Sequence, residues 1–184
     1  MGLAQHQAAL AQLFVDAEAR KEFAADPRAF AHRRGLEGAD AERLAKLTPA
    51  ALNRHAASLT SKRSLDLAKA LPATAKALGP DFRALVRRAI EGRGFSRNPC
   101  DDAGAFTALV AQEARARRIQ PHGIADLARF ELAALRASRL QWGVSCRVFR
   151  RPPAAIVGAS RHGLYIAIWM RAPGGRLRSL RIGF

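Results

Sequence analysis

Apolar residues recur at three- and four-residue spacing through the first 140 residues, which is the pattern of helices that each bury one face. The first stripe begins at Leu10 and ends near Phe23, so we predict one helix there. Asp26 and Pro27 then favour a new helix start, because a carboxylate caps free N–H groups and proline fits the first turn. Further stripes predict helices at about residues 27–34, 40–47, 49–60, 80–90, 102–118 and 121–140, while residues 61–70 could continue a helix or form a connector.

After residue 140 the pattern changes to short runs that are rich in β-branched and aromatic residues. Proline, glycine and polar residues separate these runs, which predicts an antiparallel meander of three or four strands at residues 142–149, 154–158, 163–171 and 176–184. In the last run, Leu180, Ile182 and Phe184 share a face that is more apolar than the face of Leu177 and Arg181. We expect helix 121–140 to cover the apolar face of the sheet.

These patterns together predict an α+β fold, in which N-terminal helical lobes are followed by a small C-terminal antiparallel β-sheet. We divide the chain into a small helical lobe at residues 1–63, a helical domain at residues 64–140, and a sheet at residues 141–184 that packs on helix 121–140. A domain of this size can bury about 70% of its unfolded surface, so the chain needs no covalent staples.

Glu131 interrupts the apolar stripe of helix 121–140. It falls between Ala128 and Leu135 on the same face, where a buried carboxylate without a partner would be costly. We therefore expect Glu131 to meet a buried arginine or backbone N–H groups, with a structural ion pair as the default interpretation. The alternative is that Glu131 organises a polar seam against the C-terminal sheet or a partner subunit.

The formal net charge of +16 is distributed unevenly along the chain. No aspartate or glutamate follows Glu131, whereas residues 132–184 contain ten arginines and therefore carry a local charge of +10. Biased codon usage could enrich arginine, but it does not explain the missing carboxylates. Such a field attracts an acidic peptide, an acidic protein surface or a nucleic acid. The candidate peptide-binding residues are Arg147, Arg150, Arg151, Arg161, Arg171, Arg178 and Arg181.

The usual motifs of catalytic and metal sites are missing from the sequence. The five histidines are scattered without an HExxH pair, and there is no GxSxG, phosphate-binding loop or GxGxxG motif. Cys100 and Cys146 are too few for a disulfide framework, and Cys100 is expected in a loop beside two aspartates, which disfavours a reactive thiolate. We expect a binding protein without a metal or cofactor of its own, not an enzyme.

The cellular setting follows from the same composition. Two cysteines without a disulfide pattern suit a reducing cytoplasm. No apolar run reaches the roughly 18 residues of a membrane span, and the first residues lack the features of a signal peptide. We expect a cytoplasmic protein that does not engage a membrane.

Two modes of binding suit an arginine-rich sheet. In the first, an exposed strand edge accepts an extended peptide through main-chain hydrogen bonds, and the arginines select an acidic one. In the second, the arginines hold phosphates while aromatic side chains stack on bases. The candidate aromatic residues could equally belong to the core, since they lie among valine, leucine and isoleucine; they are Trp142, Phe149, Tyr165 and Trp169.

Three segments resemble a known family of small partner proteins. They read LPATAKALGPDFRALVRRAI at residues 71–90, DDAGAFTALV at residues 101–110 and PHGIADLARFELAALR at residues 121–136. Together they are similar to the proteins that accompany multinuclear non-haem iron oxidative enzymes in ribosomal peptide biosynthesis, such as the methanobactin-type and thiaglutamate-type pathways. The front segment LFVDAEARKEFAADPRAFAHRRGL is similar to small helical modules that precede such proteins.

The resemblance implies a non-catalytic subunit that forms a heterodimer with an iron-bearing barrel enzyme and captures the leader of an acidic precursor peptide. The iron would belong to the partner enzyme, so this chain itself would hold no cofactor. A basic nucleic-acid-binding protein is the alternative, because the strong positive charge is a departure from the family pattern.

Overall fold

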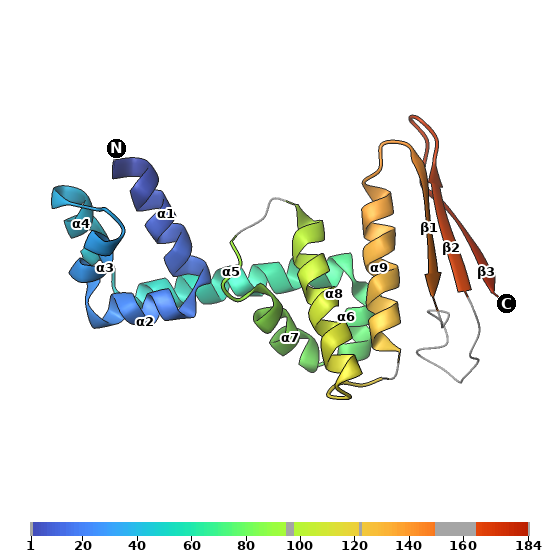
Figure 1. Cartoon of the computed structure of the whole chain (residues 1–184), viewed down its shortest axis with the longest axis horizontal. Coiled ribbons are helices and arrows are strands. Elements are labelled where there is room, and N and C mark those ends of the chain that lie inside the picture. Colours follow the sequence, from blue (N-terminus) through green and yellow to red (C-terminus); the bar gives the residue numbers. More distant parts are fainter. Residues whose placement is uncertain (1, 95–97, 122, 150–164, 184) are drawn as a thin grey trace. The chain divides into compact units, whose positions relative to one another are not determined.

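The computed structural model describes residues 2–94, 98–121, 123–149 and 165–183, in which a series of helices is followed by a three-stranded antiparallel sheet (Figure 1). This architecture confirms the predicted α+β fold class. The chain divides into two compact units, the first made of Met1–Ser64 and Ile90–Arg97 and the second of Leu65–Ala89 and Asn98–Phe184.

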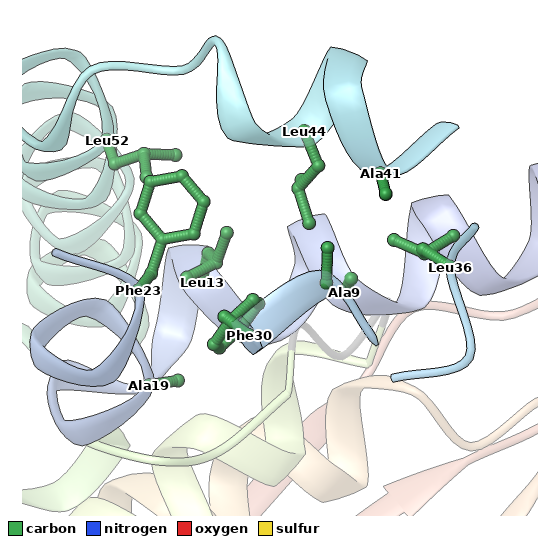
Figure 2. Close-up of a cluster of buried hydrophobic side chains, with 10 residues drawn as sticks. Ala9, Leu13, Ala19, Phe23, Phe30, Leu36, Ala41, Leu44 and Leu52 are labelled. Atoms are coloured by element: carbon green, nitrogen blue, oxygen red, sulfur yellow. The ribbon is translucent and has the colours of Figure 1, made fainter. Parts of the chain in front are cut away.

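The first unit is built from short helices around a core of its own. Its helices are α1 (Gly2–Val15), α2 (Ala17–Ala25), α3 (Pro27–Arg33), α4 (Gly38–Ala45) and the first part of α5 (Pro49–Ala70). Figure 2 shows their buried side chains converging, and the rings of Phe23 and Phe30 meet edge to face at 5.5 Å between centroids. The cluster consists of Ala9, Leu13, Ala19, Phe23, Phe30, Ala31, Leu36, Ala41, Leu44 and Leu52.

Two aspartates cap the starts of α2 and α3 in this unit. Asp26 accepts a hydrogen bond from the Ala29 N–H at 2.9 Å and precedes Pro27, which confirms the predicted start of α3. The prediction of one helix up to Phe23 is wrong, because α1 ends at Val15 and Asp16 caps a separate helix. The Asp16 carboxylate accepts from two backbone N–H groups of the first turn of α2, which makes a new start more favourable than continuation.

Residues 61–70 belong to α5, so they continue a helix and do not form a connector. The boundary between the two units falls inside α5, after Ser64, next to the predicted end of the first lobe at residue 63. Residues 90–97 also belong to the first unit, where the Gly92 N–H donates to the Val15 carbonyl at 3.1 Å.

The second unit contains α6 (Pro72–Leu78), most of α7 (Asp81–Ile90), α8 (Pro99–Arg115) and α9 (Ile124–Ser138). The predicted start of the helix at Asp102 is wrong. Asn98 is the cap, and its side chain accepts from the Cys100 N–H at 3.0 Å, so that Pro99 takes the first position of α8. Cys100 therefore lies buried in the first turn of α8 and not in a loop.

The sheet consists of β1 (Gly143–Phe149), β2 (Tyr165–Arg171) and β3 (Arg178–Gly183) in the order β1-β2-β3, with both pairs antiparallel. These strands match three of the four predicted runs. The fourth predicted run, at residues 154–158, lies outside the described residues. Because β2 is central, β1 and β3 are the edge strands of the described sheet.

Helix α9 covers one face of the sheet, which confirms the expected packing and is visible where α9 runs alongside β1 in Figure 1. The sheet does not form a compact unit separate from residues 64–140, because its inner side chains share a core with α9. The ring of Phe130 from α9 lies 5.5 Å from Trp169 and 5.6 Å from Phe149, between centroids. The remaining members of this core are Ala133, Ala134, Ala137, Leu140, Tyr165, Ala167 and Leu177.

The opposite face of the sheet, which we call the outer face, is also apolar. The prediction that α9 covers the more apolar side of the last strand is wrong, since Leu180 and Ile182 point outward while Leu177 packs inward. The large aromatic side chains of β1 and β2 decide which face meets α9. By the strand register, the outer face contains Val144, Cys146, Val148, Ile166, Ile168, Met170, Arg178, Leu180 and Ile182.

Candidate functional site

A groove of about 710 Å³ lies in the second unit, in the corner formed by the C-terminal half of α8, one side of α9 and strand β1. Small residues give it room: Ala111 and Ala114 come from α8, and Gly123, Ala125 and Ala133 come from the start and side of α9. Wider side chains at these positions would fill the corner. The groove therefore follows from the alanine-rich composition of the two helices.

Four arginines line this groove, and one carboxylate accompanies them. Arg115 comes from α8, Arg129 and Arg136 come from α9, and Arg147 comes from β1. Arg129 and Arg136 share a side of α9 because residues seven apart are separated by about two helical turns. Asp126, one turn before Arg129, completes this charged edge. Four cations against one anion leave the groove strongly positive.

The arginines of the groove are weakly neutralised. Arg129 donates to Asp126 at 3.2 Å, with about half of the Arg129 side chain exposed. Arg115 and Arg147 donate to the carbonyl oxygens of Ala111 and Cys146, at 3.1 and 2.9 Å. Within the described ranges, Arg115, Arg136 and Arg147 have no carboxylate partner. These guanidinium groups are available to an anionic ligand.

The groove runs beside the edge of β1 that faces away from β2. Strand β1 pairs with β2 on one side only, so alternate backbone N–H and C=O groups on its other side have no strand partner in the part of the sheet that is described. Ser145, Arg147, Val148 and Phe149 of this strand line the groove. Unsatisfied main-chain groups and arginine side chains thus occur at the same place.

Arg171, one of the arginines predicted to bind peptide, makes hydrogen bonds within the protein. Its guanidinium donates to the carbonyl oxygens of Gly175, Ser138 and Leu140, at 3.0, 3.0 and 2.9 Å. These bonds join the end of β2 to the turn that follows it and to the end of α9. Arg171 therefore fixes the sheet against α9.

The predicted arginines that the structure describes do not gather at one site. Of these, only Arg147 lines the groove. Arg178 lies on the outer face, and the Arg181 guanidinium lies on the inner side, 5.6 Å from the centroid of the Phe130 ring. The remaining three, Arg150, Arg151 and Arg161, lie outside the described residues.

Sequence reasoning missed three arginines of the groove. Arg115 lies in α8, and Arg129 and Arg136 lie in α9, whereas the arginines predicted to bind peptide all lie between residues 147 and 181. The seven-residue spacing of Arg129 and Arg136 was a usable signal for a basic helix side. Only the packing of α8 against α9 brings Arg115 beside them.

Three of the four candidate aromatic residues belong to the core. Phe149, Tyr165 and Trp169 are buried against α9, which confirms the core interpretation for them and leaves their rings inaccessible to a base. Burial raises the pKa of the Tyr165 hydroxyl, and the nearby Arg181 cation opposes that rise. Trp142, which precedes β1, is 70% exposed.

Glu131 caps α6. Its two carboxylate oxygens accept from the N–H groups of Ala73 and Thr74, each at 2.8 Å, at the first turn of that helix. The expectation that Glu131 meets backbone N–H groups is confirmed. The default interpretation of an ion pair is wrong, because the helix start supplies both donors, and the polar contact is made with α6 and not with the sheet.

Replacing Glu131 with alanine is expected to lower the free energy of unfolding of the second unit by about 1–2 kcal/mol, the typical cost of losing a helix cap. Glu131→Gln should lose less, because one amide oxygen still accepts. Urea titrations followed by tryptophan fluorescence measure the change, since both tryptophans lie in this unit. The control is Gln112→Ala, at an exposed position of α8; equal stability of E131A and the control would contradict the capping role.

No cluster of three or more histidine, cysteine, aspartate or glutamate side chains with the geometry of a metal site occurs in the described parts of the chain. No helix in those parts is both long and apolar enough to cross a membrane. Asp126 pairs with Arg129 at 3.2 Å, and His122 lies outside the described residues. Comparisons with protein-family models, with curated proteins and with solved structures find no match.

Proposed function

We propose that this chain is a non-catalytic subunit that binds an extended, acidic segment of a precursor peptide along β1 and presents it to an iron-dependent oxidative enzyme. The observation that supports peptide binding is the arginine-lined groove beside the edge of β1 that has no partner strand among the described residues. The enzyme partner is suggested by the resemblance of residues 71–90, 101–110 and 121–136 to partner proteins of such enzymes.

Strand addition is the mode of binding that the edge supports. An extended peptide placed next to β1 satisfies the free N–H and C=O groups of the strand and becomes a fourth strand. With seven residues in β1, the paired segment is about six or seven residues long. Main-chain pairing supplies affinity without regard to sequence, so side-chain contacts must supply selectivity.

Charge supplies that selectivity. Carboxylates of a bound peptide would approach Arg115, Arg129 and Arg136, whose positive charge is balanced only by Asp126 within the groove. Charge-assisted hydrogen bonds from arginine to carboxylate are about twice as strong as neutral ones. Because the groove is open to solvent, we expect added salt to weaken the complex.

Reversing the charge of the groove tests the proposal. The double variant Arg129→Glu, Arg136→Glu is expected to bind a fluorescein-labelled acidic peptide of eight residues at least tenfold more weakly, because two attractive contacts become repulsive. Fluorescence anisotropy of the labelled peptide measures the affinity. The matched control is Arg83→Glu, Arg87→Glu, which changes the net charge equally on the exposed side of α7.

The two outcomes of this comparison are clearly separated. A loss confined to the groove variant supports the proposed site. Equal losses in both variants would show that affinity follows net charge alone, and the groove would then not be the binding site. Circular dichroism of both variants confirms that they are folded.

Co-expression tests the enzyme partner separately. When this chain is co-expressed with a barrel-type iron enzyme from the same genome, we expect the two to co-elute during size exclusion, in the presence and absence of an acidic peptide. Separate elution under both conditions would overturn the partner assignment and leave the peptide-binding site to be judged by the anisotropy experiment.

Nucleic acid is the second candidate ligand, and the net charge of +16 is the observation that favours it. Burial of three candidate aromatic residues leaves Trp142 as the exposed one of the four. Titration of single-stranded and duplex DNA and RNA against salt separates the two candidates. Nucleic acid would be favoured if the chain bound it more tightly than the acidic peptide, and if the logarithm of the association constant fell steeply with the logarithm of the salt concentration.

A further inference from the structure

We propose that the segment bound along β1 alternates carboxylates with apolar residues, so that each face of the added strand matches a different surface of this chain. The inference rests on the proposed function and specifies the class of peptide that the same site accepts. It follows from two observations that lie on opposite sides of β1: the arginine groove and the apolar outer face.

The register of the sheet fixes which side chains meet. Side chains that lie opposite one another on paired strands point to the same face. Residues of the added strand opposite Ser145, Arg147 and Phe149 therefore point toward α8 and α9, and those opposite Val144, Cys146 and Val148 point to the outer face. One peptide thus faces two chemically different environments at alternate positions.

The inner positions favour acidic residues. Arg115, Arg129 and Arg136 lie on the helix side of the groove, and Arg147 is a cross-strand neighbour on β1 itself. Opposite charges on directly paired positions stabilise a sheet, while like charges destabilise it. Lysine or arginine at these positions of the peptide is excluded by the same four cations.

The outer positions favour apolar residues. Val144 and Val148 are 69% and 59% exposed, whereas Met170, Leu180 and Ile182 on the other strands are 40%, 48% and 36% exposed. The exposure is greatest on β1, whose valines have a neighbouring strand on one side only in the described sheet, as β3 also does. A fourth strand with apolar side chains on this face would cover the open flanks of both valines and bury apolar area.

Composition alone is therefore insufficient for binding, and the order of residues matters. A peptide with its carboxylates in one block and its apolar residues in another places half of each kind on the wrong face. It can satisfy the main chain of β1 but loses about half of the side-chain contacts. Alternation is the property that distinguishes the proposed ligand from an acidic peptide in general.

Synthetic peptides test the pattern with the full chain. Four eight-residue peptides, each labelled with fluorescein, are compared by anisotropy at low salt: alternating Asp-Val, its isomer with four Asp followed by four Val, alternating Asp-Ser, and alternating Lys-Val. We expect the alternating Asp-Val peptide to bind at least tenfold more tightly than its isomer and than alternating Asp-Ser, and the Lys-Val peptide not to bind.

Two variants show which kind of peptide side chain contacts the outer face and which contacts the groove. Val144→Ser should weaken alternating Asp-Val severalfold and leave alternating Asp-Ser unchanged, because Val144 does not line the groove, while the double variant Arg129→Glu, Arg136→Glu should weaken both. Equal affinity of the two Asp-Val isomers would overturn the alternation and leave acidic-peptide binding intact. Failure of all the acidic peptides to bind the wild-type chain would overturn both the alternation and the proposed function.

Discussion

Replacing Phe130 with alanine is expected to lower the free energy of unfolding of the second unit by about 3 kcal/mol, the lower end of the range for a phenylalanine in a core. The Phe130 ring is partly buried and joins α9 to both β1 and β2. Its centroid lies 5.6 Å from that of Phe149, 6.3 Å from that of Tyr165 and 5.5 Å from that of Trp169. No smaller side chain reaches all three rings.

Urea titration with two optical probes measures this effect. Trp169 is buried beside Phe130, so its fluorescence and near-ultraviolet circular dichroism report the packing of the sheet on α9. Phe130→Leu is the matched variant, because it keeps most of the apolar volume and should cost clearly less than F130A. Equal stability of wild type and F130A would mean that the sheet does not depend on this contact.

Replacing Arg88 with alanine is expected to have the second large effect and to lower the free energy of unfolding of the second unit by about 2–3 kcal/mol. Glu113 on α8 has only 3% of its side chain exposed, and it accepts from the Arg88 guanidinium at 2.7 Å. Arg118 is farther away, at 3.6 Å. Removing Arg88 leaves a buried carboxylate without its nearest cation, which is more costly than the loss of an exposed ion pair.

A double-mutant cycle separates the pair from the individual residues. Arg88→Ala combined with Glu113→Leu removes the buried charge together with its partner, so the double variant should be more stable than R88A alone. Urea titrations of the wild type, the two single variants and the double variant give the coupling energy. A double variant whose loss equals the sum of the two single losses would show that the two residues are not coupled.

Local signals in the sequence predicted much of the fold. The Asp26-Pro27 pair marked the start of α3, and the runs of β-branched and aromatic residues located β1, β2 and β3. The break at Asp16 was missed because the apolar stripe continues through it, although the Asp16 carboxylate caps the new helix. A cap within an unbroken apolar stripe is visible only when the backbone N–H groups that it serves are located.

Features that depend on packing between elements were harder to predict. Both faces of the sheet are apolar, so alternation in the last strand could not indicate which face meets α9; the aromatic residues of the neighbouring strands decide it. The groove was missed for a related reason. Arg115 is the last residue of α8 and Arg136 lies near the end of α9. Only the pairing of α8 with α9 brings both to the same groove.

Cys146 provides a natural site for a probe that reports on the edge of β1. Of the two cysteines in the sequence, Cys100 is buried in α8 while Cys146 is exposed on the outer side of β1, between Val144 and Val148. A thiol-reactive dye or spin label can therefore be attached at the edge strand without altering any other residue. Because the label would sit beside the free flank of β1, its mobility would change when that flank is occupied, whichever ligand occupies it.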